Sequence, residues 1–294
     1  MVVSLSQIAR QLLRRVPPFR RAQGPPPPLP SGAVIDPAFA GRKRAKLDRI
    51  RPLLRDDLPH GETETFYDFL SDDLRTQFHI TDTDNVSANN YDDHAARMIE
   101  IHSGGFVLDC GAGLRPVYYD NVVNFDICPY PTTDVRGVGE RLPFKDGVFQ
   151  AVFSFAVLEH VRDPFACAKE IMRVLVPGGR LYCVVPFLQP LHGYPHHYFN
   201  MSHEGLRSLF EDGMEIKRQE VPPSGQPIWT LTWLLRRWAA QLPESARREL
   251  LSHKVGDLLA DPREYLDRSF VRDLPLEAQM ELASTTALFA EKPE

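Results

Sequence analysis

The sequence has few cysteines, no long apolar run and no excess of positive charge. Its four cysteines show no Cys-x-x-Cys spacing, which argues against a disulfide framework or a zinc knuckle and favours a reducing compartment. No stretch approaches the roughly 18 consecutive apolar residues of a membrane-spanning helix. With 34 Lys+Arg against 39 Asp+Glu, the formal net charge is −5, so the overall charge does not attract nucleic acid. These absences predict a cytoplasmic protein without a nucleic-acid partner.

Apolar residues and prolines are plentiful. Hydrophobic residues make up 43% of the 294 residues, enough for the core of a large domain. The 26 prolines are about twice the number expected from an average usage of roughly 5%. Residues 1–35 combine five arginines, no acidic residue and the run Pro25–Pro28. We interpret them as a poorly ordered basic arm, with an organellar transit peptide or a peripheral membrane contact through residues 1–22 as alternatives.

Short apolar runs dominate the chain from about residue 104. They lie close to Gly, Pro or Asp, which is typical of strands buried on both faces of a parallel sheet. Asp163 as N-cap, followed by Pro164, predicts a helix between the last two runs, and strand-helix-strand is the unit of a right-handed crossover. The runs are residues 106–108, 122–125, 151–153 and 181–185.

These patterns divide the chain into three parts. Residues 1–35 form the arm, residues 36–103 a helical extension, and residues 104–294 the sheet domain. A strand is expected at residues 214–221, and a β-rich segment at 284–290 predicts a late strand. The stretch of about 223–282 before it, with its apolar helical stripe, is then a helical insertion between the last two strands.

An acidic residue and two glycines end the first apolar run. Asp109 is followed by Gly111 and Gly113. Glycines let the backbone turn sharply and approach a ligand that a Cβ would push away, and a carboxylate at a strand end can orient an amino group. A dinucleotide site would need Gly-x-Gly-x-x-Gly, and Pro116 stands at its third glycine. The pattern therefore disfavours a nicotinamide or flavin dinucleotide.

Three further motifs follow in order. Asp126 ends the second apolar run, where a carboxylate can accept hydrogen bonds from both hydroxyls of a ribose. The second consists of GERLPF at residues 139–144 together with FAVLEHV at 155–161, and the third is LVPGGR at 175–180.

In this order the motifs resemble those of the class I S-adenosylmethionine-dependent methyltransferases, in particular the small-molecule type. The resemblance covers about residues 90–222 and the final strand. It implies an α/β fold: a Rossmann-like, seven-stranded, mostly parallel sheet of order 3-2-1-4-5-7-6, with the last strand antiparallel and helices on both faces. It also implies S-adenosyl-L-methionine as cofactor and methyl transfer as the reaction. Arg115 stands where the family has a third glycine.

The resemblance implies a role for each matching residue. The bend after the first strand would hold the methionine part of the cofactor, the acid after the second strand the ribose, and the later motifs the adenine and the region near the sulfonium. In that order the residues are Asp109, Gly111, Ala112 and Gly113; Asp126 and Ile127; Glu140, Arg141 and Leu142; Phe155 and Ala156.

Histidines are the candidates for the acceptor side. If the acceptor is a hydroxyl, a proton must leave, and histidine can take it near neutral pH. We select His160, His196 and His197 as candidate catalytic residues. His192 and His196 could supply two metal ligands, but no carboxylate or thiolate completes a set of known spacing, so we predict no metal. Tyr91, which precedes a helix, is interpreted as an ordinary helix entry rather than as a cover over the cofactor.

The sequence thus predicts methyl transfer to a small or medium-sized acceptor, with a sugar- or lipid-linked acceptor suggested by the basic arm. The alternative is a catalytically silent domain that binds the cofactor, or nothing, and acts as a scaffold. A side chain at Gly111 is expected to occupy ligand space and abolish cofactor binding while leaving the fold mostly intact.

Overall fold

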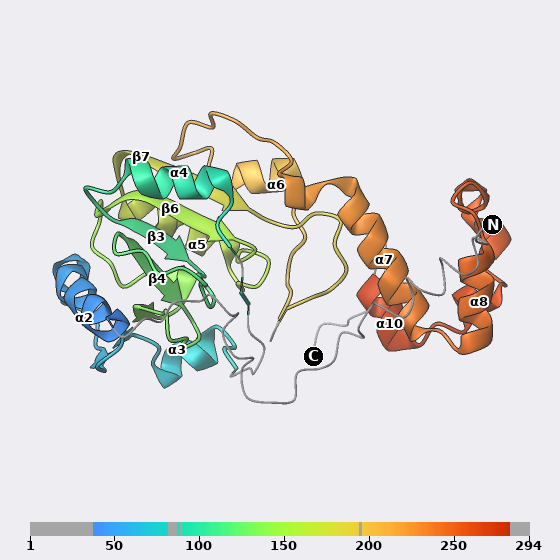
Figure 1. Ribbon diagram of the computed structural model, residues 1–294, viewed down its shortest axis with the longest axis horizontal. Helices are drawn as coiled ribbons and strands as arrows, with labels where there is room; N and C mark the ends of the chain where they lie inside the picture. The colour runs from blue at the N-terminus through green and yellow to red at the C-terminus, as the bar shows by residue number, and fades with distance from the viewer. Residues whose placement is uncertain (1–37, 82–86, 89, 194–195, 283–294) are drawn as a thin grey trace, which may run out of the picture. The chain divides into compact units, whose positions relative to one another are not determined.

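The computed structural model describes residues 38–81, 87–88, 90–193 and 196–282 (Figure 1). The predicted arm and the predicted last strand at 284–290 lie outside these residues. The described chain separates into two compact units, one ending at Gln226 and the other beginning at Pro227.

The first unit is built on a sheet of seven strands among the described residues, in the order β1-β2-β5-β4-β3-β6-β7. Parallel pairing joins β2 to β5, β5 to β4, β4 to β3, β3 to β6 and β6 to β7. The strands are β1 (Gly61–Glu62), β2 (Tyr67–Asp68), β3 (Val107–Cys110), β4 (Val122–Asp126), β5 (Val135–Arg136), β6 (Phe149–Phe155) and β7 (Leu175–Val184).

The Rossmann-like, mostly parallel sheet is confirmed, and so is the order 3-2-1-4-5 of its five parallel core strands, which are β5, β4, β3, β6 and β7. The two remaining strands differ from the expectation. They come from residues 61–68, within the stretch predicted to be wholly helical, and they extend the sheet beyond β5. The antiparallel strand is β1, at that edge.

The expected strand at residues 214–221 does not form. Glu215, Lys217, Arg218 and Glu220 are exposed there, and the segment runs into Pro222 and Pro223. Alternating charges cannot pack against a sheet buried on both faces, and proline cannot donate to a ladder of hydrogen bonds.

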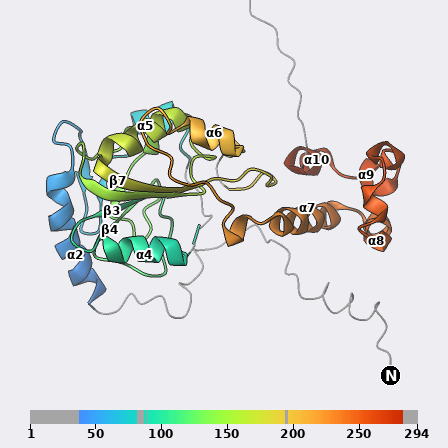
Figure 2. The ribbon, with the colours of Figure 1, turned by 90° about the horizontal axis from the view of Figure 1, so that it is seen from above.

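Helices cover both faces of the sheet (Figure 2). Ala95, Met98 and Ile99 of α4 pack on one face, against the β3 residue Val107 and its neighbours. The next residue, Leu108, points to the other face, where it joins the core that includes α5. This alternation follows from the two-residue period of a strand. The helices of this unit are α2 (Phe39–Ile50), η1 (Arg51–Leu53), α3 (Asp72–Gln77), α4 (Asp93–Ile101), η2 (Gly139–Arg141), α5 (Pro164–Val174), α6 (His203–Ser208) and η3 (Pro223–Gly225).

Helix starts follow their sequence signals closely. The side chain of Asp163 accepts a hydrogen bond of 2.9 Å from the Ala166 N–H and begins α5, as predicted. Ser202 caps α6 in the same way through Gly205. A capping side chain satisfies a backbone N–H that has no partner within the helix.

The second unit has its own apolar core, made by Leu242, Ala246, Leu250, Phe270, Leu274 and Ala278. No helix in the described parts of the chain is both long and apolar enough to cross a bilayer. The helices of this unit are α7 (Pro227–Gln241), α8 (Glu244–Ser252), η4 (Asp257–Leu259), η5 (Pro262–Tyr265), α9 (Ser269–Arg272) and α10 (Leu276–Leu282).

Candidate active site

The chain leaves β3 through a bend made by Gly111 and Gly113. Both have positive φ angles, +81° and +62°, a region that glycine enters without a steric penalty. A Cβ on Gly111 would come within 2.3 Å of the Val157 side chain, and one on Gly113 within 2.5 Å of the Ser87 carbonyl oxygen. The protein itself therefore crowds the bend, and a side chain at Gly111 would meet Val157 as well as any ligand. Such a change is therefore expected to destabilise the fold in addition to affecting the ligand, a cost that the expectation of a mostly intact fold did not include.

Asp126 joins the end of β4 to this bend. Its Oδ2 accepts the Gly113 N–H at 2.7 Å and its Oδ1 accepts the Cys128 N–H at 2.8 Å. The carboxyl is only 8% exposed, and burial raises its pKa to about 6 although the two N–H groups act in the opposite direction. Each oxygen has a second lone pair, so the carboxylate can still accept hydrogen bonds from a ligand.

Asp109, at the other side of the bend, is held by Arg115. The guanidinium donates from Nε to Oδ2 at 2.7 Å and from Nη2 to Oδ1 at 3.1 Å. The Tyr91 hydroxyl donates to Oδ2 at 2.5 Å, and the guanidinium lies 4.4 Å from the centre of the Tyr91 ring. Asp109 is fully buried and Arg115 is 3% exposed. The ion pair thus joins the two ends of the loop from residue 109 to 115.

The bend and the two acids fit the nucleoside cofactor that the motifs imply. Asp109 and Asp126 hold the same short loop, through Arg115 and Gly113 respectively, and the charge of Asp109 contributes to the raised pKa of Asp126. A sharp bend at the end of the central strand and a carboxylate with lone pairs to spare are the features that such a ligand needs. The two carboxylates therefore belong to one site.

The remaining residues of the predicted cofactor site fall into two groups. Ala112 and Leu142 are buried; the Leu142 side chain lies in the core and its N–H donates to Glu170, so the structure gives it a packing role. Ala156 is exposed and has a φ of +55°, a strained conformation that tends to mark functional sites. The other residues of the predicted set, Ile127, Glu140, Arg141 and Phe155, retain partial or full exposure.

Glu140 connects the third motif to the start of α5. Its Oε1 accepts the Arg162 N–H at 3.1 Å, and burial raises its pKa although backbone N–H groups nearby lower it. The carboxyl group therefore helps to position the turn that follows β6.

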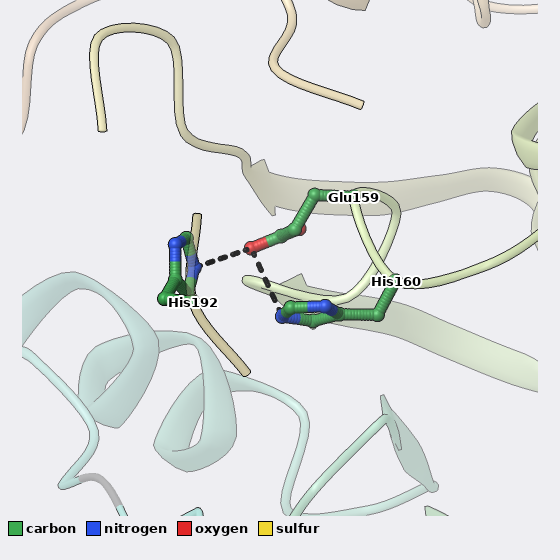
Figure 3. A group of neighbouring side chains, drawn as sticks. All are labelled: Glu159, His160 and His192. Carbon is green, nitrogen blue, oxygen red and sulfur yellow. Dashed lines mark ion pairs between the residues drawn. The ribbon is translucent and has the colours of Figure 1, made fainter. Parts of the chain in front are cut away.

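That turn carries Glu159 and His160, and the loop after β7 brings His192 to them (Figure 3). Oε1 of Glu159 lies 3.8 Å from Nε2 of His160 and 3.9 Å from Nε2 of His192. Burial lowers the pKa of His192, but the Glu159 carboxylate and the Pro190 carbonyl together raise it by more, so the net shift of this pKa is upward. The sequence offered no carboxylate for the histidines of this loop, and the fold supplies one from a different loop.

His196 and His197 lie in the same loop and have different surroundings. The backbone carbonyl of His196 accepts from His160 Nδ1 at 2.7 Å. His197 accepts the His192 N–H through Nδ1 at 3.1 Å, and its Nε2 lies 3.0 Å from Oδ1 of Asn200. Burial lowers the pKa of His197. Both of its ring nitrogens are thus used inside the loop, which favours a neutral ring that shapes the loop.

Three residues at this edge of the sheet were not selected as site residues from the sequence. Tyr91 contacts Asp109 rather than serving only as a helix entry. Arg115 was noted as a substitution for a glycine, and its pairing with Asp109 needed the fold. For Glu159 a signal existed: it is an acidic residue between the apolar Leu158 and a histidine, and both Leu158 and Glu159 prove to be buried.

Comparison with known proteins agrees with this geometry. Residues 108–183 match a family model described as a methyltransferase domain. Norajmaline N-methyltransferase from Rauvolfia serpentina is 27% identical over 120 residues, which are 39% of this chain and 35% of that protein. Cycloartenol-C-24-methyltransferase 1 from Oryza sativa subsp. japonica is 34% identical over 73 residues, 25% of this chain and 20% of that protein. The chain thus spans well under half the length of these relatives.

Among solved structures, the YcgJ protein from Bacillus subtilis is similar with a TM-score of 0.36 and 18% identity, over 60% of this chain and 88% of that one.

A parallel sheet of this order, with a glycine bend after its central strand and an acid after the next, defines an α/β domain that binds a nucleoside cofactor. Residues 108–183 match a methyltransferase-domain family, which agrees with the resemblance of the motifs to the class I S-adenosylmethionine-dependent methyltransferases. S-adenosyl-L-methionine is the cofactor of this family.

Proposed function

We propose that the protein transfers the methyl group of S-adenosylmethionine to a small or medium-sized acceptor. The observation that carries the proposal is the joining of Asp126 and Asp109 to one glycine bend at the ends of neighbouring parallel strands. The cofactor supplies an electrophilic methyl group for in-line displacement. The chain's part is then to align the acceptor and to exclude water.

On the cofactor side, Asp126 accepts hydrogen bonds from the ribose through the lone pairs that Gly113 and Cys128 leave. The bend from Gly111 to Gly113 receives the methionine part, and Asp109 acts there through the guanidinium of Arg115. Ile127, Glu140, Arg141 and Leu142 lie around the base, the last through packing alone, and Phe155 and Ala156 lie near the sulfonium.

On the acceptor side, we assign the turn after β6 and the loop after β7. His160 is the first candidate for removing a proton from a hydroxyl acceptor, with His196 and His197 as further candidates. The same loop exposes Phe187, Leu188 and Leu191, at 55%, 61% and 48%. These exposed apolar side chains support an acceptor with a lipid-like part, and the histidines of the loop, as polar groups, are compatible with a sugar-linked acceptor.

Titration calorimetry with S-adenosylhomocysteine tests the cofactor site. We expect binding by the wild type and a loss of about 1–3 kcal/mol for Asp126→Ala, which removes a charged hydrogen-bond acceptor. Glu211→Ala, at an exposed position of the same unit, is the matched control and should bind normally. Unchanged affinity in Asp126→Ala would show that the ribose does not bind there.

A catalytically silent scaffold is the second candidate. Its support is the Arg115 guanidinium, which neutralises the Asp109 carboxylate that would otherwise attract the amino group of the cofactor. Binding of S-adenosylmethionine without turnover on a panel of hydroxyl, amine and lipid-linked acceptors would favour this candidate. Turnover of any acceptor that disappears when the cofactor site is mutated would exclude the scaffold.

A further inference from the structure

Glu159 is a buried carboxylate without a compensating hydrogen bond. Its side chain is fully buried, and neither oxygen accepts a hydrogen bond from any residue that the structure describes. A buried carboxylate in this state is costly and is retained only when a proton, a cationic side chain or a metal ion balances it. The surroundings of Glu159 therefore have to supply that balance.

Two imidazoles face this carboxylate from different loops. Nε2 of His160 and Nε2 of His192 lie 3.8 and 3.9 Å from Oε1, as the dashed lines in Figure 3 show. These separations exceed the roughly 2.7–2.9 Å of a charge-assisted hydrogen bond. The carboxylate and the two rings thus face one another without a direct hydrogen bond between them.

The opposite side of each ring is held by a backbone carbonyl. His160 Nδ1 lies 2.7 Å from the His196 carbonyl oxygen, and His192 Nδ1 lies 2.9 Å from that of Pro190. A carbonyl oxygen can only accept a hydrogen bond, so each Nδ1 carries a hydrogen. In the neutral ring Nε2 then carries a lone pair, and this lone pair faces Glu159. Metal-binding histidines are typically oriented by such a carbonyl on their second nitrogen.

We propose that Glu159, His160 and His192 bind a divalent transition-metal cation, for which zinc is the best-suited ion. The ligand atoms all lie within 4.8 Å of one another. Ligands about 2.0–2.2 Å from a tetrahedral zinc ion are about 3.4 Å apart, so the three side chains need to close by only a fraction of an ångström to an ångström and a half. The charge of the cation balances the buried carboxylate.

Three protein ligands leave a coordination position open, as in catalytic zinc sites. Water takes that position in the resting protein. If the proposed function holds, a hydroxyl of the acceptor would take it, and the cation would then lower the pKa of that hydroxyl in place of proton removal by His160, whose Nε2 is a ligand. Metal binding itself does not depend on that second step.

Cobalt(II) is the first probe, since a tetrahedral cobalt site absorbs visible light. The full chain is treated with a chelator, desalted and titrated with Co²⁺, and Zn²⁺ is then added to displace it. We expect one Co²⁺ per chain, d–d absorption of tetrahedral intensity and its loss on adding one equivalent of Zn²⁺. Absence of this absorption together with no calorimetric Zn²⁺ binding would overturn the proposal.

Variants identify the ligands. Glu159→Gln and His192→Ala should each weaken Zn²⁺ binding at least tenfold and remove the tetrahedral absorption. His203→Ala is the matched control, because His203 also lies next to a glutamate, with Nε2 3.2 Å from Oε1 of Glu204, but both are exposed. Zn²⁺ affinity unchanged in the first two variants, or lowered equally in the control, would show adventitious binding and refute the site.

Two further measurements keep the outcome interpretable. Circular dichroism melting checks that each variant is folded, and His192→Asn replaces His192→Ala if the latter is not. Titration with S-adenosylhomocysteine is done separately on the same samples. Loss of Zn²⁺ binding with normal S-adenosylhomocysteine binding would place the failure at the metal ligands, whereas the reverse pattern would concern the cofactor site alone.

Discussion

Replacement of Arg115 by methionine tests whether the glycine bend is held by a buried ion pair. Methionine keeps much of the apolar length of the side chain but removes the two hydrogen bonds to Asp109. Asp109, fully buried, is left with the Tyr91 hydroxyl alone. Removing one partner of a buried ion pair costs about 3–5 kcal/mol because the other charge stays uncompensated. We expect a loss of this size in the free energy of unfolding of the unit that ends at Gln226.

A double-mutant cycle separates the ion pair from other effects of the change. Arg115→Met combined with Asp109→Asn removes both charges and should cost less than the sum of the single changes, with a coupling energy of about 2 kcal/mol. Tyr91→Phe removes one hydrogen bond to a charged group and should cost about 1.5–3 kcal/mol. Arg207→Met is the matched control: its ion pair with Glu211 is exposed and should contribute no more than about 0.5 kcal/mol.

The assay of unfolding has to report on the unit that contains Arg115. All three tryptophans, Trp229, Trp233 and Trp238, lie in α7, so tryptophan fluorescence reports the second unit. Hydrogen exchange followed by mass spectrometry, on peptides covering β3 and β4 over a urea series, reports the first. A cost for Arg115→Met no larger than that of the control, or additive behaviour in the cycle, would refute this account of the bend.

Two other predictions concern the same loop. The pKa of Asp126 is raised from 3.8 to about 6, so the folded state binds this proton more tightly than the unfolded state. The contribution of Asp126 to the free energy of unfolding is therefore full below about pH 4. It is lost as the pH rises through 6, by about 3 kcal/mol. Urea unfolding at pH 4 and pH 7 should show this difference between wild type and Asp126→Asn, and identical pH dependence in the two proteins would contradict it. Gly111→Ala should destabilise more than Gly178→Ala, because both glycines have positive φ, +81° and +76°, but only a Cβ at Gly111 meets a neighbour, Val157. We expect about 1–2 kcal/mol of backbone strain at either site. At Gly111 we expect an additional cost, which Val157→Ala relieves. Equal losses of stability in the two glycine variants in melting experiments would show that Val157 moves aside freely.

Local signals predicted much of the central fold. Asp163 and Ser202 cap helices where their side chains can reach backbone N–H groups, and the four apolar runs formed β3, β4, β6 and β7. Such features depend on neighbours in the sequence. The strands β1 and β2 were missed because each has only two residues, too few for an alternating pattern to be recognised.

The candidate site divides in the same way. The sequence by itself determined the glycine bend after β3, the acid after β4 and the turn after β6, since each lies next to an apolar strand whose end is marked in the chain. Only the tertiary structure decided that Arg115 and Tyr91 bind Asp109 and that Val157 crowds Gly111. It alone also decided that His192 meets Glu159, which is 33 positions earlier in the chain. The physical reason is that residue type and spacing specify which strands and turns form, whereas the partner of a buried charge depends on which loops the finished sheet brings together at one edge.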